Sequence, residues 1–209
     1  LARAKANLEK LTVDLKVKAD ELSKSREKVF TPLCKQITRL LVELGIPNAS
    51  LKIENDKITP AASGIDSIEL FFSANKGITP RPLAQVASGG EFSRLMFSVK
   101  YVMAEKTSLP TMILDELDSG VSGEIAIQLG KMMKEMAKRH QIISISHLPQ
   151  IAAKSDTHFF VYKDNSSSKT VSLIKKLTEE ERVTEIAKMI GGARPSTMAL
   201  ENAKELIAG

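Results

Sequence analysis

Residues 111–116, Thr-Met-Ile-Leu-Asp-Glu, place an apolar run directly before two adjacent carboxylates. A short apolar run of this kind predicts a buried strand of a parallel sheet, which requires an α/β fold with helices on the sheet's faces. Asp115 and Glu116 would then lie at the carboxyl end of that strand, where open α/β sheets place their ligands. A buried carboxylate is costly without a partner, and Mg²⁺ or a polarised water would be such a partner.

Composition and cysteine content limit the class of protein. With 209 residues, 43% of them apolar, the chain can bury the core of one substantial domain plus an appendage. Aromatic residues make up 4% and tryptophan is absent, which argues against a nucleic-acid site built on stacked rings. Cys34 is the single cysteine, so we expect a reducing, cytoplasmic setting without disulfides or cysteine-based metal clusters. We see no secretory signal and no run long enough to cross a bilayer, so no membrane partner is expected.

A seven-residue repeat predicts a long helix at the amino terminus. Leucine or valine recurs at every seventh position: Leu1, Leu8, Leu15, Leu22 and Val29. Ala4 and Leu11 fill the second seam of the repeat, until Lys18 interrupts it. The pattern is typical of the end of a coiled coil, and an amphipathic helix lying on its own domain is the alternative. Because the chain opens inside this helix without a methionine, we expect it to be a fragment of a longer protein.

Turn residues divide this segment from the rest of the chain. Thr31 and Pro32 predict that the helix is capped and restarts there, and it should end near Gly45. We therefore expect residues 1–45 to form an arm and connecting helix, and residues 46–209 to form the main lobe.

Most of the excess positive charge lies in the same segment. Residues 1–44 carry ten Lys or Arg and six Asp or Glu, which accounts for four of the five net positive charges. A basic surface of this kind could face nucleic acid, or it could be the solvated face of a helix with mixed charges.

Periodicity and turn residues predict the remaining elements. The expected strands are at residues 50–54, 67–73, 111–114, 141–146, 158–162 and 170–176. The expected helices begin at residue 90 and run over residues 123–139, 148–154, 179–190 and 196–207. A row of methionines on the second of these helices is expected in the core: Met132, Met133 and Met136.

Four residues before the helix at residue 90 form a candidate phosphate-binding turn: Ser88, Gly89, Gly90 and Glu91. Two glycines leave backbone N–H groups bare and let a phosphate approach closely. The start of a helix adds positive potential and unpaired donors, and Ser88 adds a hydroxyl. The same tetrapeptide also occurs in ordinary turns, so its function depends on what lies near it.

Three further side chains are candidates for chemistry. Asp115 is placed to hold a hydrated Mg²⁺ ion, and Glu116 to orient or deprotonate an attacking water. The alternative is an ordinary strand exit with two solvated acids. His147 ends another apolar strand, where it could hydrogen-bond a phosphate oxygen or serve a structural role. His140 and His158 lack a comparable setting, and we expect both to be structural.

Spacing favours the functional alternatives. Ser88 precedes Asp115 by 27 residues, which leaves room for one helix and one strand. Glu116 precedes His147 by 31 residues, which fits a βαβ crossover that brings both strand ends to one edge of the sheet. Asp118 follows the two acids in a polar loop that could line a subunit contact.

These motifs resemble those of ABC-type ATPases. Ser88, Gly89, Gly90 and Glu91 resemble the signature motif, and residues 112–116 resemble the Walker B strand. Asp118 resembles the D-loop aspartate, and His147 resembles the switch histidine. The closer resemblance is to the RecN family of bacterial DNA-repair proteins, relatives of the SMC chromosome-organising ATPases. It rests on the runs at residues 81–83, 87–94, 115–123, 146–153 and 182–192.

The resemblance implies an α/β fold, namely the carboxyl-terminal lobe of an ABC-type head with a mostly parallel sheet and a coiled-coil stub. It implies an ATPase of the bacterial nucleoid that acts in double-strand break repair and recombination, with ATP and Mg²⁺ as cofactors. Asp115 would hold Mg²⁺ through water, and Glu116 and His147 would be catalytic. The ligands of ATP on the opposite head would be Ser88, Gly89, Gly90, Glu91 and the D-loop residue Asp118.

One part of such a site is missing from the sequence. No glycine begins the phosphate-loop pattern Gly-x-x-x-x-Gly-Lys-[Ser/Thr]. The resemblance implies that this loop lies in an amino-terminal half of the protein. We therefore expect that half, a second head and DNA as partners. We also expect the fragment by itself to be inactive. The alternatives are a non-catalytic dimerisation or scaffold module and a plain DNA-binding domain.

Overall fold

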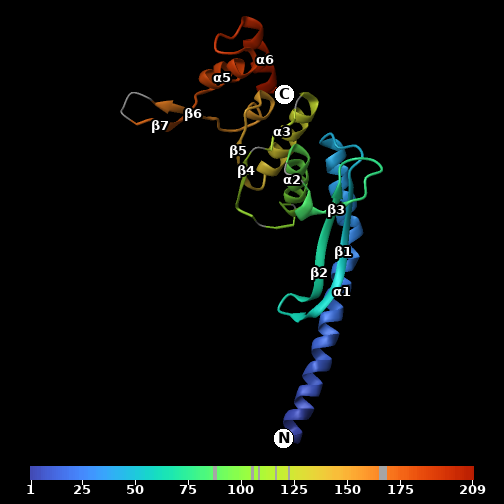
Figure 1. Cartoon of the computed structure of the whole chain (residues 1–209). Helices are drawn as coiled ribbons and strands as arrows, with labels where there is room; N and C mark the ends of the chain where they lie inside the picture. Colours follow the sequence, from blue (N-terminus) through green and yellow to red (C-terminus); the bar gives the residue numbers. More distant parts are fainter. Residues whose placement is uncertain (87–88, 105, 108, 116, 122, 165–168) are drawn as a thin grey trace. The chain divides into compact units, whose positions relative to one another are not determined.

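The structure is a computed structural model that describes residues 1–86, 89–104, 106–107, 109–115, 117–121, 123–164 and 169–209. Figure 1 shows the course of the chain, which divides into two compact units, Leu1–Val102 and Met103–Gly209. No helix in the described ranges combines the length and apolar character needed to span a membrane. The division expected at residue 45 remains a prediction.

The first unit begins with one long helix, α1 (Ala2–Glu43). The expectation that the helix restarts at Pro32 is wrong, because α1 continues through the proline. Proline removes one backbone hydrogen bond from a helix. The turns of α1 after Pro32 are stabilised by packing, since Ile37 and Leu41 are 2% and 0% exposed. This packing outweighs the lost hydrogen bond. The chain turns away at Gly45, at φ 81°, as expected.

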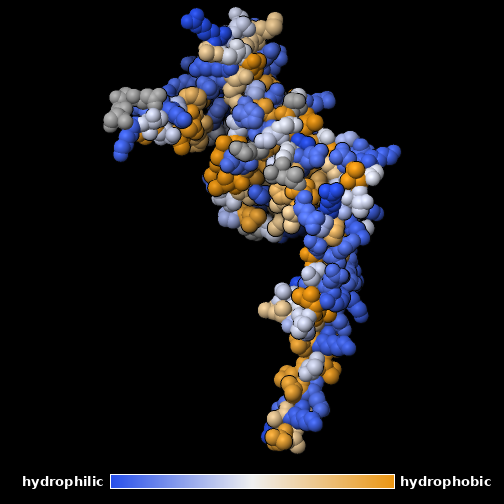
Figure 2. Space-filling model, in the orientation of Figure 1, coloured by the Kyte–Doolittle hydropathy of each residue, from blue (hydrophilic) through white to orange (hydrophobic). Residues whose placement is uncertain are grey.

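The amino-terminal part of α1 extends beyond the rest of its unit (Figure 1). Residues 1–18 are all exposed, including Leu8 at 66% and Leu15 at 53%. Apolar side chains are visible along this part of the helix in Figure 2. Residues 1–18 therefore do not form an amphipathic helix that lies on its own domain. Their apolar repeat faces solvent.

A three-stranded antiparallel sheet in the order β1-β2-β3 packs beside α1. Its members are β1 (Ser50–Ala61), β2 (Gly64–Ser73) and the short β3 (Arg81–Pro82), followed by the 3₁₀ turn η1 (Leu83–Gln85). The hairpin β1–β2 is longer than expected because its polar residues pack and pair along α1. At its tip Gly64 has φ 104°, and a Cβ atom there would lie 3.1 Å from Arg26 Nη1 and Leu22 Cδ2.

A buried carboxylate joins the hairpin to α1. The side chain of Asp66 on β2 has 0% exposure. Its Oδ1 accepts hydrogen bonds from Ser23 Oγ at 2.6 Å, Lys57 Nζ at 2.9 Å and Asn55 Nδ2 at 3.0 Å. Its Oδ2 accepts one from Arg26 Nη1 at 2.9 Å. These bonds, those from Ser23 and Lys57 above all, hold the pKa of Asp66 far below its ordinary value.

The core of the first unit lies where α1, the sheet and the helix α2 (Gly90–Ala104) meet. Its buried residues are Ile37, Leu41, Ile46, Phe72, Leu95 and Val102. Burial of each such side chain stabilises the fold by about 1.5–3 kcal/mol. This cluster therefore fixes the carboxyl-terminal half of α1 and the helix that follows the candidate phosphate turn.

The second unit contains the parallel strands β4 (Thr111–Asp115) and β5 (Gln141–Ile145), joined by α3 (Gly123–Ala137). We expected a mostly parallel sheet. Among the described residues, β4 and β5 are the strands that pair in parallel. As expected, the methionines of α3 are buried: Met132, Met133 and Met136. The helix packs on one face of the sheet, where Met112 and Leu114 are also buried.

The other elements of this unit are α4 (Pro149–Ala152), the antiparallel hairpin β6 (Phe159–Asp164) and β7 (Val171–Lys176), α5 (Glu179–Gly191) and α6 (Thr197–Ala208). A capping box begins α5, since Thr178 Oγ1 accepts from the Glu181 N–H and the Glu181 carboxylate accepts from the Thr178 N–H. The core between α4, α5 and α6 consists of small and branched residues: Ala153, Ile186, Ala187, Ala199 and Ala203.

Candidate functional site

The first part of the candidate site is the start of α2 in the first unit. Gly90 is the first residue of this helix and Glu91 lies in its first turn. A Cβ atom built on Gly89 would meet no atom of the described residues within 4 Å, which would let a ligand approach the backbone here. Ser88 lies outside the described residues, and its place in this turn stays a prediction.

Arg94 adds a cation one turn into the same helix, and sequence reasoning did not single it out. Its side chain is half-buried, and among the described residues its Nε atom lacks a hydrogen-bond partner. Burial lowers the pKa of this guanidinium, which the carboxylate of Glu91 partly offsets. The start of α2 therefore carries the guanidinium of Arg94 and the carboxylate of Glu91 in addition to its helix potential.

The second part lies at the carboxyl ends of β4 and β5. Asp115 is the last residue of β4 and is paired in register with Ile145, the last residue of β5. Because the strands are parallel neighbours, Asp115 and the pair Ser146 and His147 lie at the same edge of the sheet, as expected from the spacing. The Asp115 side chain is exposed, whereas Asp118, in the turn after β4, is 2% exposed.

Asp118 connects the two strand ends. Its Oδ2 atom accepts a hydrogen bond from Ser146 Oγ at 2.6 Å and another from the backbone N–H of His147 at 2.9 Å. The Nδ1 atom of the His147 ring lies 3.1 Å from the same oxygen. Ser146 Oγ also accepts from the N–H of Leu148 at 3.1 Å. Sequence reasoning gave no role to Ser146 and did not foresee that Asp118 binds His147.

Glu116 lies outside the described residues, so its role as the base stays a prediction. No group of three or more His, Cys, Asp and Glu side chains in the described ranges could hold a metal by itself. The exposed carboxylate of Asp115 suits a hydrated Mg²⁺ ion, because Mg²⁺ is usually held by one or two carboxylates with waters and substrate phosphates.

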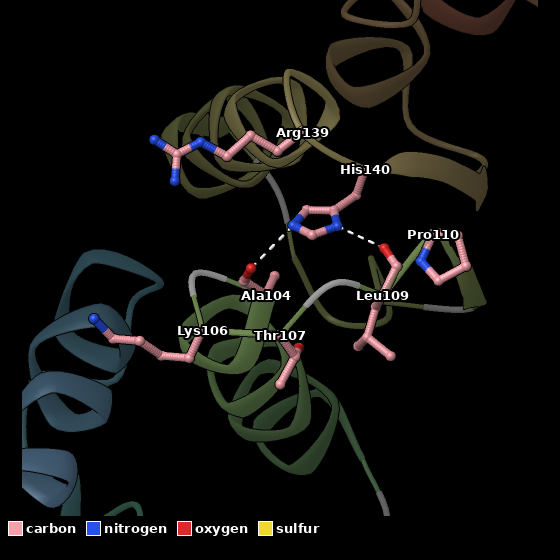
Figure 3. Close-up of a pocket in the computed structure, with 7 residues that line it drawn as sticks. All are labelled: Ala104, Lys106, Thr107, Leu109, Pro110, Arg139 and His140. Atoms are coloured by element: carbon pink, nitrogen blue, oxygen red, sulfur yellow. Dashed lines mark hydrogen bonds between the residues drawn. The ribbon is translucent and has the colours of Figure 1, made fainter.

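A separate open pocket of about 480 Å³ lies at the opposite edge of the sheet (Figure 3). Its lining residues are Ala104, Lys106, Thr107, Leu109, Pro110, Arg139 and His140. Leu109 and Pro110 precede β4 and His140 precedes β5, so this is the amino-terminal edge, away from the edge where α/β sheets bind ligands. His140 Nδ1 lies 2.6 Å from the carbonyl oxygen of Leu109 and Nε2 lies 3.0 Å from that of Ala104, which agrees with a structural role.

His158 is also placed as a structural residue. It is half-buried, and burial together with the nearby Arg182 guanidinium lowers its pKa. Arg182 is itself buried on α5 and donates to the carbonyl oxygens of Ala153 at 2.7 Å and Ser155 at 2.6 Å. Arg182 therefore fixes the loop that leads from α4 to β6.

Comparison with known proteins identifies the relatives of this chain. No family model matches the sequence. The DNA repair protein RecN of Deinococcus radiodurans is 38% identical over 205 residues, which cover 98% of this chain and 36% of that protein. RecN of Vibrio cholerae is 36% identical over 191 residues, which cover 90% of this chain and 34% of that protein. The chain thus spans about a third of the length of these relatives.

Solved structures of SMC heads share the fold. The Smc head domain of Pyrococcus yayanosii, with its coiled coil and joint, matches 90% of this chain and 35% of that one, with a TM-score of 0.62 at 19% identity. The Smc head domain of Pyrococcus furiosus matches 91% of this chain and 44% of that one, with a TM-score of 0.60 at 17% identity. The chain therefore has the α/β fold of part of an SMC head, and it belongs to the RecN family.

Proposed function

We propose that this chain supplies the catalytic lobe of an ATP-hydrolysing, SMC-like head that acts in DNA repair. The observation that carries the proposal is the meeting of Asp115, Asp118 and His147 at the carboxyl edge of β4 and β5. A carboxylate and an imidazole that are exposed at the same edge of a sheet suit phosphoryl transfer to water. Membership of the RecN family supports DNA repair as the process.

Each residue has a distinct role in this proposal. Asp115 would hold Mg²⁺ through water, and the ion would neutralise the charge of the phosphates. Glu116 accepts the proton of the attacking water, and His147 hydrogen-bonds a γ-phosphate oxygen.

The start of α2 acts on a second head. Ser88 and the N–H groups of Gly89 and Gly90 clasp the γ-phosphate of ATP that the opposite head holds, aided by the helix potential. Glu91 completes the motif, and the loop of Asp118 lines the contact between heads. A solved structure of similar fold comes from work on the ATP-driven dimerisation of SMC ATPases. It matches 80% of this chain and 97% of that one, with a TM-score of 0.53 at 17% identity.

An uncovered sheet face supports a missing partner half. On the face of the β4–β5 sheet away from α3, Ile113 is 61%, Ile143 45% and Ile145 58% exposed. Strands of a parallel sheet are normally covered on both faces. We propose that the amino-terminal half of the same protein, hereafter the phosphate-loop half, covers this face and brings the loop that grips ATP. The exposed repeat of α1 supports pairing of residues 1–18 with another helix of that protein as a coiled coil.

ATP-dependent pairing of assembled heads tests the proposal. Heads that carry Glu116→Gln should bind ATP without consuming it and form dimers, measured by light scattering. Adding Ser88→Arg should abolish the dimers, because the arginine side chain fills the space of the phosphate. Ser50→Arg, at the exposed start of β1, is the matched control and should leave dimerisation intact. Pairing that is the same with and without ATP would favour a non-catalytic scaffold.

The DNA-binding alternative has its own signature. If the basic residues of α1 alone carried the function, the isolated chain would bind DNA with an affinity that falls steeply with salt. If the head function is correct, the isolated chain should bind DNA only weakly.

A further inference from the structure

The segment that follows β5 holds the backbone of His147 on both sides of its Cα atom. The N–H of His147 donates a hydrogen bond to Asp118 Oδ2 at 2.9 Å. The N–H of Leu148 donates to Ser146 Oγ at 3.1 Å, which closes a tight turn around His147. The peptide groups before and after His147 are therefore both fixed, although the side chain is 72% exposed.

The Ser146 hydroxyl joins this segment to the turn after β4. It donates to Asp118 Oδ2 at 2.6 Å while it accepts from Leu148. A hydroxyl has one proton and two lone pairs, so Ser146 can serve both groups at once. The side chain of Asp118 is 3% exposed, so water competes little for the bond. Loss of this one hydroxyl would therefore remove two bonds, one on each side of the connection.

The turn that carries Asp118 is itself well anchored. Leu117 and Val121 are 8% and 6% exposed, and the carbonyl oxygen of Asp118 accepts from the N–H of Val121 at 3.1 Å. Between them Ser119 is half-buried and Gly120, at φ 69°, is exposed. The tip of the turn thus lies at the surface, whereas the Asp118 carboxylate binds the end of β5. A second head that met this turn would contact the tip.

We propose that Ser146 is a positioning residue that connects the turn after β4 to His147, so that a contact on the turn sets where the His147 side chain lies. This role rests on the proposed function, in which His147 contacts the γ-phosphate and the turn lines the contact between heads. It adds a form of regulation to that site. The second head acts on hydrolysis through Asp118 and Ser146, in addition to its own contact with the phosphate.

Exchange of backbone amides with deuterium tests the connection without ATP. In the assembled head, the peptide of residues 145–149 reports the amides of His147 and Leu148. Ser146→Ala should speed their exchange by about tenfold, because the Leu148 N–H loses its acceptor. Ser146→Thr keeps a hydroxyl and should stay within about twofold of the parent head. Unchanged exchange in Ser146→Ala overturns the inference.

ATP turnover by the assembled head tests the effect on chemistry. Ser146→Ala should lower kcat by about tenfold and leave KM for ATP within about twofold, because a misplaced group slows the reaction while the grip on ATP is elsewhere. Ser146→Thr should restore turnover to within about twofold of the parent head. Ser144→Ala, at an exposed serine of β5, is the matched control and should also leave turnover within about twofold.

A second background separates positioning from a general structural role. In heads that carry His147→Ala, adding Ser146→Ala should change the single-turnover rate by less than about twofold, because the group that Ser146 positions is gone. A further tenfold or so loss in that background, or parent turnover in Ser146→Ala alone, overturns the inference. Failure of the proposed function is distinct, because it would leave the parent head without turnover, whereas amide exchange is measured without ATP.

Discussion

At the scale of single residues, two buried carboxylates have different partners and so different roles. Asp66 is held by the cations Arg26 and Lys57, and it joins β2 to α1. Asp118 accepts hydrogen bonds from Ser146 Oγ and from the backbone N–H of His147, and it ties the end of β5 to the turn after β4. A buried carboxylate that lacks its partners is costly in either place. We therefore expect loss of Asp66 to loosen the hairpin from α1, and loss of Asp118 to loosen the turn after β4 from the end of β5.

The pH dependence of stability tests the first role. The folded-state pKa of Asp66 lies below the ordinary value of 3.8, so ionised Asp66 stabilises the fold fully above that value. Asp66→Asn should lower the midpoint of thermal unfolding by roughly 5–15 °C between pH 5 and 8. The difference between parent and variant should shrink as the pH falls below about 3.8, as the unfolded chain takes up the proton first.

Asp56→Asn is the matched control for this measurement, because Asp56 lies exposed on β1. It should change the midpoint by no more than a few degrees. A difference between parent and Asp66→Asn that stayed constant down to pH 2 would contradict the assigned ion pairs.

Glu116 is the residue whose loss should affect chemistry most. In the assembled head Glu116→Gln should reduce ATP turnover by about 10²–10⁴-fold, because the amide cannot accept the proton of water. ATP affinity should change little, since the grip on the phosphates is elsewhere. Glu124→Gln, at the exposed start of α3, is the control. Turnover of Glu116→Gln at the parent rate would show that another group is the base.

The sequence could predict part of this site. The apolar runs before Asp115 and Ser146 and the helix-sized spacing between them required neighbouring parallel strands, so the shared edge followed. The hydrogen bond from the backbone N–H of His147 to Asp118 could not be predicted, because it depends on the path of the turn after β4, which no residue spacing specifies.

At the scale of elements, the uncovered face of β4 and β5 carries the next prediction. Ile143→Lys should leave the thermal midpoint of the chain within about 3 °C, because the side chain is already 45% exposed. It should weaken binding to the phosphate-loop half at least tenfold or so, since a charge would enter an apolar interface. Isothermal titration of the two parts measures the affinity.

Ile58→Lys is the matched control, because Ile58 on β1 is also 45% exposed. It should change the affinity by less than about twofold. Equal effects of the two variants would mean that the β4–β5 face is not the contact surface.

Elements differed in how well local pattern predicted them. Apart from the short β3 and η1, which were not expected, the order of helices and strands followed from periodicity, as did the burial of the methionines on α3. Pro32 did not end a helix, because Ile37 and Leu41 beyond it are buried in a core formed by distant residues. The hairpin β1–β2 extends past its apolar residues because Asp66 and its partners bind it to α1, a contact between segments some 40 residues apart.

At the scale of the whole molecule, the chain spans about a third of its RecN relatives and lacks a phosphate loop in its sequence. In the proposed function, the lysine and hydroxyl of such a loop in the phosphate-loop half hold the β- and γ-phosphates. The isolated chain should therefore show negligible heat on titration with ATP and Mg²⁺. Tight, Mg²⁺-dependent binding by the isolated chain would contradict this division of roles.

The central claim is that the reacting carboxylates and the grip on ATP belong to different parts of one protein. The most direct test is the rate of ATP hydrolysis by this chain, by the phosphate-loop half, and by the two mixed in equal amounts. We expect neither part alone to hydrolyse ATP and the mixture to do so, with the activity lost when the chain carries Glu116→Gln. Hydrolysis by the isolated chain at the rate of the mixture, or a mixture no more active than its parts, would contradict the account.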